Sequence, residues 1–187
     1  MEIPNPGLRL SHLTGLTTKG AYIKIFSGLA VSDVSKLWND LIYLRDETDH
    51  RTVDIFINSP GGDAFSGLAL SDLVEIAQNE WGFTVRAHAS GIVASAAVPV
   101  FASCQIRWAA KGTIFMVHEA ALWKWPGRET ASDISSQNDL MKLLRDKYIG
   151  ILVDNSNTSY EEWRIMEKKT SWFGVDKARE LGLLERN

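Results

Sequence analysis

Short apolar runs typical of strands alternate along the chain with longer segments whose apolar side chains recur every three or four residues. The strand-like runs cover residues 21–26, 53–57, 83–87, 105–108 and 113–117. The helix-like segments cover residues 34–44, 68–77, 94–102, 132–154 and 175–181. This repeated strand–helix–strand order predicts an α/β fold, in which helices pack on a mostly parallel sheet through right-handed crossovers.

The length of 187 residues suits one domain and not two full ones. Residues 1–20 hold two prolines and three glycines without a sustained period, so we expect an arm or loop there and a single domain over residues 21–187. Ser159 and Glu162 have the spacing of a capping box, which predicts one more short helix. Gly182 is expected to end the last helix.

Composition narrows the classes of function. With 20 basic and 23 acidic side chains the net charge is −3, which excludes a strongly basic nucleic-acid binder. The single Cys104 excludes an internal disulfide framework and a Cys-rich zinc site, and its apolar surroundings predict an inert core thiol. The sequence contains no phosphate-loop, HExxH or EF-hand spacing, so no cofactor or metal is expected.

One uncharged window raises the question of a membrane segment. Residues 87–106 carry no Asp, Glu, Lys or Arg, which is nearly the length of a membrane span. Pro99 and several polar side chains interrupt the window, so a strand, a turn and a buried helix explain it better. The first residues also lack the apolar core of a secretory signal. We therefore expect a cytoplasmic protein without membrane partners.

Ligands gather in open α/β folds where strands end and helices begin, and two such junctions stand out. The first is Asn58-Ser59-Pro60-Gly61-Gly62, where two glycines permit a tight turn and close approach of a bound group. Its amides, near a helix N-terminus, could donate to an anion or a polarised carbonyl. An ordinary strand-to-helix turn is the alternative.

The second junction, residues 89–97, places Ser95 among small residues at the expected start of a helix. Small neighbours leave space for a substrate carbonyl above the hydroxyl, and the following amides point toward the same space, as a serine nucleophile requires. The alternative is a small-residue helix that packs closely on the sheet, with Ser95 capping it or bonding back to its backbone.

A serine nucleophile also needs a base, and the chain has four histidines. His12 lies in the expected arm, His50 in a charged loop, and His88 at a strand end where a structural role is expected. His118 ends another strand-like run, so it could reach the same rim of the sheet as Ser95. A capping or buried-network histidine is the alternative for His118.

Taken in order, these motifs resemble one family, the proteolytic subunit of the Clp protease. The matching segments are FINSPGGDAFSGLALSD, ASGIVASAAVPVFAS, GTIFMVHEA, ASDI and GVDKARELGLLE. The family shows an INSPGG turn, an A-S-M-G nucleophile turn, an M-I-H segment and a closing S-A-E-E-A-x-x-x-G-L-I-D. The resemblance runs from about residue 21 to residue 185, and the ordered set is much more specific than any single motif.

The resemblance implies roles for particular residues. Ser95 would be the nucleophile, His118 the general base that takes its proton, and the backbone amides of Gly62 and Ala96 the oxyanion hole. The fold would be ClpP/crotonase-like, with repeated β-β-α/βαβ units, and the helix over residues 132–154 would be the handle that pairs two rings. The resemblance further implies a homo-oligomeric assembly of stacked rings, a partner AAA+ ATPase, and peptides or unfolded proteins as substrates.

One departure from the family concerns the third, acidic member of the triad. Aligning the closing motif puts Thr170 at that position, in the segment KKTSWFG, which contains no carboxylate. A threonine accepts a hydrogen bond from imidazole but cannot balance the charge of an imidazolium. Either Glu119, Glu167 or Asp176 substitutes in space, or the enzyme is a serine–histidine dyad, or its activity is weak.

Two lesser departures accompany the missing acid. Ala97 stands where the family has glycine, and the loop between His118 and Ala131 is longer than usual. That loop carries Trp123-Lys124-Trp125-Pro126, which is either a substrate or subunit contact or a hydrophobic anchor beside a solvated lysine. Phage relatives that mature capsids are similar in the segment around Thr170.

Three functions remain open at this point. The first is an ATP-dependent Clp-type serine endopeptidase that works through an acyl-enzyme, with a phage-type head maturation protease as a variant. The second is a catalytically weak or inactive ring subunit, which Thr170 motivates. The third is an acyl-CoA enzyme of the crotonase type, which uses a similar oxyanion hole without a nucleophilic serine.

Overall fold

The computed structural model describes residues 13–17, 20–121 and 130–184 of the chain. Its strands are β1 (Leu13–Thr17), β2 (Gly20–Ile25), β3 (Thr52–Ser59), β4 (Thr84–Ala94), β5 (Ile106–Ala109), β6 (Ile114–Val117) and β7 (Ser171–Gly174). Its helices are α1 (Val31–Glu47), α2 (Ala64–Asn79), α3 (Ala97–Ala102), α4 (Ala131–Asp154), α5 (Tyr160–Lys168) and α6 (Val175–Glu180).

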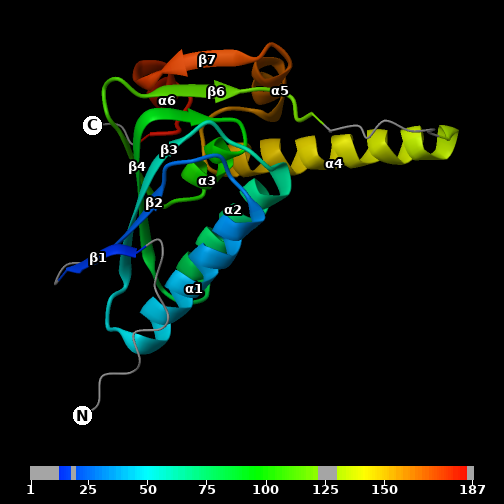
Figure 1. Ribbon diagram of the computed structural model, residues 1–187. Helices are drawn as coiled ribbons and strands as arrows, with labels where there is room; N and C mark the ends of the chain where they lie inside the picture. The colour runs from blue at the N-terminus through cyan, green and yellow to red at the C-terminus, as the bar shows by residue number, and fades with distance from the viewer. Residues whose placement is uncertain (1–12, 18–19, 122–129, 185–187) are drawn as a thin grey trace.

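The strands form a single sheet, and most of it is parallel. The strand order is β1-β2-β3-β4-β6-β7, with β5 paired to β4 off this path. Strands β2 to β6 pair in parallel, whereas β1 with β2 and β6 with β7 are antiparallel. Helices α1 and α2 lie along one side of the sheet, and α4 projects away from the body (Figure 1). The predicted α/β fold with a long protruding helix is therefore confirmed.

The core lies between the sheet and helices α1, α2 and α3. Alternate side chains of β2, β3 and β4 point into it, as the two-residue period of a strand requires, and Ile23, Ile55 and Ala87 are each about 1% exposed. Leu37 and Leu41 of α1 recur one helical turn apart and are buried against the same core. The helical periodicity of the sequence therefore predicted the buried stripe of α1.

The opposite side of the sheet carries a row of partly exposed aromatic rings. Tyr22 and Phe56 have ring centroids 6.0 Å apart, Phe56 stacks on His88 at 4.7 Å, and His88 lies 6.2 Å from Trp108. His88 also holds the buried carboxylate of Asp54 at 2.6 Å from its Nε2. The structural role expected for His88 is thus confirmed, because it links two neighbouring strands.

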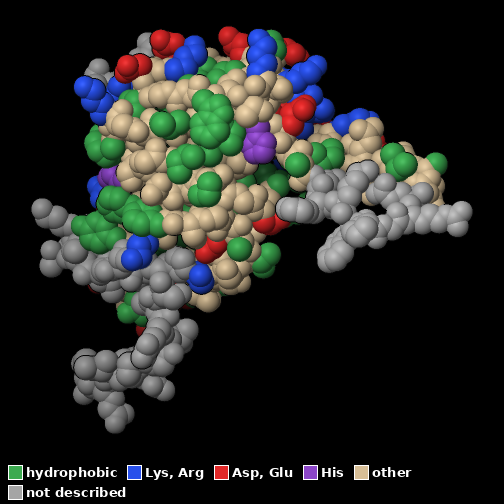
Figure 2. Space-filling model, turned by 45° about the horizontal axis from the view of Figure 1, so that its top comes forward, with side chains coloured by type: hydrophobic (Ala, Val, Ile, Leu, Met, Phe, Trp, Pro, Cys, Tyr) green, Lys and Arg blue, Asp and Glu red, His purple; other side chains and the backbone are tan. Residues whose placement is uncertain are grey.

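The exposed row continues onto β6 and β7. Ile114 is 49% exposed and Trp172 is 59% exposed. Figure 2 brings the top of Figure 1 forward and shows hydrophobic side chains in the middle of this surface, with charged side chains along its upper edge. Within the described residues this side of the sheet has no covering helix comparable to α1 and α2.

Arg107 of β5 forms hydrogen bonds to residues at or near the ends of several helices. Its guanidinium donates to the carbonyl oxygens of Ala102 at 2.7 Å, Leu183 at 2.8 Å and Asn155 at 3.0 Å. The fork of donors on an arginine suits such divergent acceptors. Cys104 lies beside it and is fully buried, and burial raises the pKa of its thiol to about 12. The prediction of an inert core cysteine is consistent with both facts.

The structure departs from the sequence prediction in three places. Strand β1 lies within residues 1–20, which were expected to be an arm or loop; residues 1–12 and 18–19 lie outside the described residues. Strand β7 was not predicted, since four residues give too short a pattern. Strand β4 continues to Ala94 through the small residues that were expected to form a turn, because its second half pairs with β6.

Most of the uncharged window of residues 87–106 is buried, whereas Ser90, Gly91, Gln105 and Ile106 are exposed. It forms most of β4, all of α3 and the first residue of β5. Across the described parts of the chain, no helix is both long and apolar enough to cross a membrane.

A buried carboxylate on α1 yields a stability prediction. Asp40 is 2% exposed, one of its carboxylate oxygens has no partner among the described residues, and burial raises its pKa to about 6. A raised folded-state pKa means that stability is greatest at low pH and is lost as pH rises through about 6. We expect Asp40→Asn to raise the free energy of unfolding at pH 8 by about 1–3 kcal/mol.

Urea denaturation of both proteins between pH 4.5 and 8 would measure this effect. The gain should shrink toward pH 4.5, where Asp40 is itself protonated. A destabilised Asp40→Asn protein at pH 8 would contradict the prediction.

Candidate active site

The turn between β3 and α2 is held by side chains of its own motif. Asn58 accepts a hydrogen bond from the backbone N–H of Ile92 at 3.1 Å, which ties this turn to β4. The Ser59 hydroxyl donates to the carbonyl of Ser27 at 2.7 Å and accepts from the Gly61 amide at 3.2 Å. These bonds place the two glycines of the turn against the end of β4.

Gly61 is required where the turn meets the neighbouring strand. Its φ is 91°, and a Cβ there would lie 2.6 Å from both the carbonyl oxygen of Ala94 and the Cβ of Ser95. Only a residue without a side chain permits both the conformation and the contact. The close approach expected of this motif therefore exists, and the group approached is the turn that carries Ser95.

Ser95 occupies a strained turn between β4 and α3. Its φ is 53°, which few residues other than glycine adopt. Its amide donates to the carbonyl of Met116 at 2.8 Å, and its carbonyl accepts from the amide of Val98 at 3.0 Å. Strain of this kind concentrates at functional sites and here turns the hydroxyl away from the strand.

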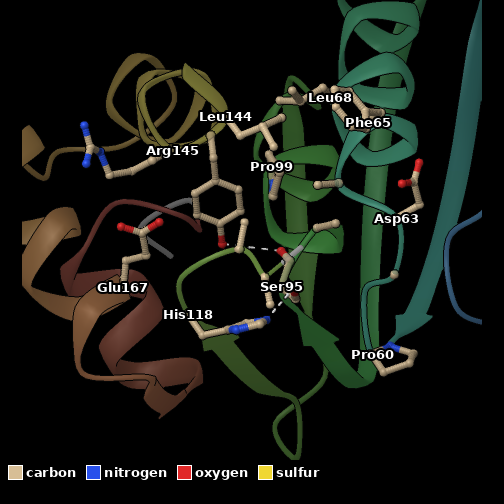
Figure 3. Close-up of a pocket in the computed structure, with 16 residues that line it drawn as sticks. Pro60, Asp63, Phe65, Leu68, Ser95, Pro99, His118, Leu144, Arg145 and Glu167 are labelled. Carbon is tan, nitrogen blue, oxygen red and sulfur yellow. Dashed lines mark hydrogen bonds between the residues drawn. The ribbon is translucent and has the colours of Figure 1, made fainter. Parts of the chain in front are cut away.

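The hydroxyl of Ser95 meets the imidazole of His118. The distance from Oγ to Nε2 is 2.8 Å, within the range for proton transfer to a general base. His118 follows directly after β6, which pairs with the second half of β4, so the two side chains come from adjacent strand ends. Figure 3 shows the imidazole pointing at the serine. The structure thus brings together the two residues selected from the sequence.

A cavity of about 650 Å³ opens in front of this pair. Three helices line it with apolar side chains, among them Phe65 of α2, Pro99 of α3 and Leu144 of α4. The Ser95 hydroxyl lies at one side, and Glu167 of α5 lies across the cavity from α2 (Figure 3). A cavity of this size, largely apolar with a few polar groups, is typical of a ligand site.

The two positions that the resemblance implied for an oxyanion hole, Gly62 and Ala96, lie at this cavity. Leu29 bonds to the residues on both sides of Gly62, donating to Gly61 at 2.8 Å and accepting from Asp63 at 3.0 Å. In a parallel bridge of this kind the residue between the two bonded ones, here Gly62, does not direct its own N–H at Leu29. The amide of Gly62 is therefore not used in this pairing. Gly62 and Ala96 both line the cavity, and their role as oxyanion donors stays a prediction.

No described carboxylate bonds to the His118 ring, and the register of the sheet brings Thr170 to its side. Strand β7 pairs with β6 so that Ser171 lies opposite Val117, and one further step in this register sets Thr170 beside His118. Thr170 is exposed, and its φ is 52°. Among the described residues, the only hydrogen-bond partner of the His118 ring is Ser95.

The three carboxylates considered as substitutes occupy different surroundings. Asp176 is fully exposed and pairs with Arg179 at 3.3 Å. Glu119 and Glu167 both accept from Nη1 of Arg164, at 2.8 and 2.9 Å, and of these two only Glu167 lines the cavity. None of the three bonds to the imidazole of His118 in the described part of the structure.

Sequence analysis did not foresee several residues of the cavity, Tyr148 among them, and could not place others. Tyr148 lines the cavity, and its hydroxyl contacts the Ser95 carbonyl at 3.4 Å. Its only signal in the sequence was a place in the apolar stripe of α4. His12 and the patch Trp123-Lys124-Trp125-Pro126 lie outside the described residues, and His50 does not line the cavity.

Comparison with known proteins agrees with this geometry. The family model described as Clp protease matches residues 9–186. The chain belongs to the Clp protease family. Membership makes it a serine peptidase, a hydrolase that acts on peptide bonds.

Individual relatives are distant but aligned over most of their length. The chain is 28% identical over 166 residues to an ATP-dependent Clp protease proteolytic subunit of Bacteroides thetaiotaomicron, covering 86% of this chain and 72% of the relative. It is 26% identical to proteolytic subunit 3 of Rhodococcus jostii, covering 79% and 71%. The fold of a mutant ClpP1 from Listeria monocytogenes is similar, with a TM-score of 0.75, 20% identity, and coverage of 87% and 88%.

The contact at Gly61 yields a prediction about the oxyanion hole. In Gly61→Ala the new methyl group would push the turn away from Ser95 and move the Gly62 amide. We expect kcat/KM on a peptide substrate to fall by about a hundredfold or more, the usual effect of losing an oxyanion donor. Gly112→Ala is the matched control, because a Cβ at Gly112 meets nothing within 4 Å. Comparable activity of Gly61→Ala and Gly112→Ala would contradict this account.

The register of β6 and β7 yields a prediction about the missing acid. Thr170→Asp would put a carboxylate beside His118, and aspartate tolerates a positive φ better than threonine does. We expect kcat to rise by about tenfold or more, because a triad carboxylate stabilises the imidazolium. Thr170→Asn relieves the same backbone strain without adding charge and is the control. An equal rise of kcat in both variants, or no rise in either, would show that a carboxylate at residue 170 does not improve catalysis.

Proposed function

We propose that this chain is the proteolytic subunit of a Clp-type serine endopeptidase, with Ser95 as nucleophile and His118 as general base. The observation that carries the proposal is the contact of 2.8 Å between Ser95 Oγ and His118 Nε2, at the side of a cavity that Gly62 and Ala96 also line. Peptides or unfolded proteins would be the substrates, as the name of the relatives indicates.

The proposed chemistry follows from these positions. Ser95 Oγ attacks the carbonyl carbon of the scissile peptide while His118 Nε2 takes the hydroxyl proton. The amides of Gly62 and Ala96 donate to the oxyanion that forms. His118 then gives the proton to the leaving amine, and a water molecule, activated by the same imidazole, hydrolyses the acyl-enzyme.

The catalytic unit in this proposal is a dyad. Without a carboxylate behind the imidazole, the positive charge that forms on His118 is stabilised less, so turnover is expected to be slower than in a complete triad. The backbone oxyanion hole does not depend on that carboxylate, and it supplies catalysis of its own. An inactive subunit and a head maturation protease are less favoured alternatives, because the relatives reported above carry the name of the proteolytic subunit.

Assembly into a homo-oligomeric ring belongs to the same proposal. Helix α4 projects from the body and exposes Ile134 and Leu143, which are 54% and 55% exposed and would be covered by a second subunit (Figure 1). A ring fed by an AAA+ ATPase would fit the name "ATP-dependent" of the relatives, and the cytoplasm is the compartment that we propose for it.

Labelling with a fluorophosphonate tests the proposal directly. The reagent should label the assembled wild-type protein at Ser95, and Ser95→Ala should abolish both labelling and cleavage of a fluorogenic peptide. His118→Ala should remove most of the labelling, since the hydroxyl then lacks its base. Wild-type protein that is folded and assembled yet neither labelled nor active would refute the proposal and favour the inactive subunit.

A further inference from the structure

The cavity beside Ser95 is apolar along most of its walls and polar at one side. Phe65, Leu68 and Pro99 supply apolar surface on the side of α2 and α3. Across from them Glu167 of α5 presents its carboxylate (Figure 3). Tyr148 of α4 also lines the cavity. A side chain that enters from the nucleophile would therefore lie along hydrocarbon and end near polar groups.

Glu167 is an unusual residue for such a position. Its side chain is only 3% exposed. Its one direct partner among the described residues is Arg164, whose Nη1 lies 2.9 Å from Oε2. The same nitrogen also donates to Glu119 at 2.8 Å, so one guanidinium serves two carboxylates. The group of Glu119, Glu167 and Arg164 therefore carries a net charge of −1.

A second arginine nearby, Arg145, already has a carboxylate partner of its own. Arg145, which also lines the cavity, lies with its Nε and its Nη2 2.9 Å from Oδ1 of Asp146, and Asp146 in turn accepts from the hydroxyl of Tyr160. This arginine is engaged with its own carboxylate.

Among the described residues, two carboxylates therefore line the cavity without a cation of their own, Glu167 and Asp63. Glu167 shares Arg164 with Glu119. Asp63 accepts from the amide and hydroxyl of Ser66. Asp63 is exposed, whereas Glu167 is buried and so has lost its hydration.

The electrostatics of Glu167 agree with incomplete neutralisation. Burial raises the pKa of this carboxyl group, and the nearby charge of Glu119 adds to the rise. The attraction of Arg164, and to a smaller extent of Arg145, opposes the rise without cancelling it. Arg164 therefore does not replace all the hydration that the carboxylate lost on burial. A cation bound in the cavity would supply the missing stabilisation.

We propose that this cavity receives the substrate side chain on the N-terminal side of the scissile bond and that Glu167 selects side chains with an apolar stem and a cationic end, namely lysine and arginine. The inference rests on the proposed function, since it assigns the specificity of the same site. The apolar walls contact the methylene stem, and Glu167 meets the charge at its end. An acidic side chain would be repelled by Glu167, and Arg145, the cation that lines the cavity in the described part of the chain, is already paired with Asp146.

Peptide substrates that differ at that one position test the inference. Fluorogenic peptides ending in lysine, leucine or glutamate before the leaving group would be compared by kcat/KM. We expect wild-type protein to prefer lysine over leucine by about tenfold or more. Glu167→Gln, which keeps the shape of the side chain, should reduce the ratio of kcat/KM for lysine to kcat/KM for leucine by about tenfold.

Glu119→Gln provides the matched control. It removes the same charge from the same arginine, but Glu119 is exposed and does not line the cavity. Its lysine preference should stay within about twofold of wild type. An equal loss of preference in both variants would assign the effect to the general charge of the region and overturn the role of Glu167.

Other outcomes separate this inference from the proposed function. A wild-type preference for leucine that Glu167→Gln leaves unchanged, or a preference for glutamate, would refute the specificity while the peptidase stands. Labelling of Ser95 by a fluorophosphonate in each variant shows that the site is folded. Absence of labelling and cleavage with every peptide in wild-type protein would instead refute the proposed function.

Discussion

The site depends on the contact between two backbone turns at the ends of adjacent parallel strands. The turn after β3 meets the turn after β4 so closely that a Cβ at Gly61 would lie 2.6 Å from the carbonyl oxygen of Ala94. This contact brings the amide of Gly62 and the hydroxyl of Ser95 to one cavity. The sheet could form with a side chain at residue 61, but the two turns would then be pushed apart.

Strand β6 connects Ser95 with His118. The carbonyl of Met116 in β6 accepts a hydrogen bond from the amide of the strained Ser95, and His118 is the first residue after β6. A residue in a sparsely populated conformation costs about 1–3 kcal/mol and persists only where its surroundings hold it. The pairing of β6 with the second half of β4 therefore both holds the strained turn and sets the distance from hydroxyl to imidazole.

Charge in this site is organised around Arg164 rather than behind the imidazole. Thr170 stands where the resemblance places an acid, while Arg164 pairs with two carboxylates, Glu119 and Glu167. Of these two only Glu167 lines the cavity, so the proposed effect on the choice of substrate side chain is assigned to Glu167 alone.

Residue patterns were enough to predict the fold class and most helices and strands, because periodicity and glycine-rich turns are local properties of the chain. The pair Ser95 and His118 could be selected because the ordered motifs that contain these residues occur together in one family. The residue patterns did not predict β1, β7 or the full length of β4, because these depend on pairing with strands distant in the chain. Glu167 and Tyr148 line the cavity only as a result of folding. Each lies in an amphipathic helix where its residue type is ordinary, and only the packing of α4 and α5 beside Ser95 makes it part of the site.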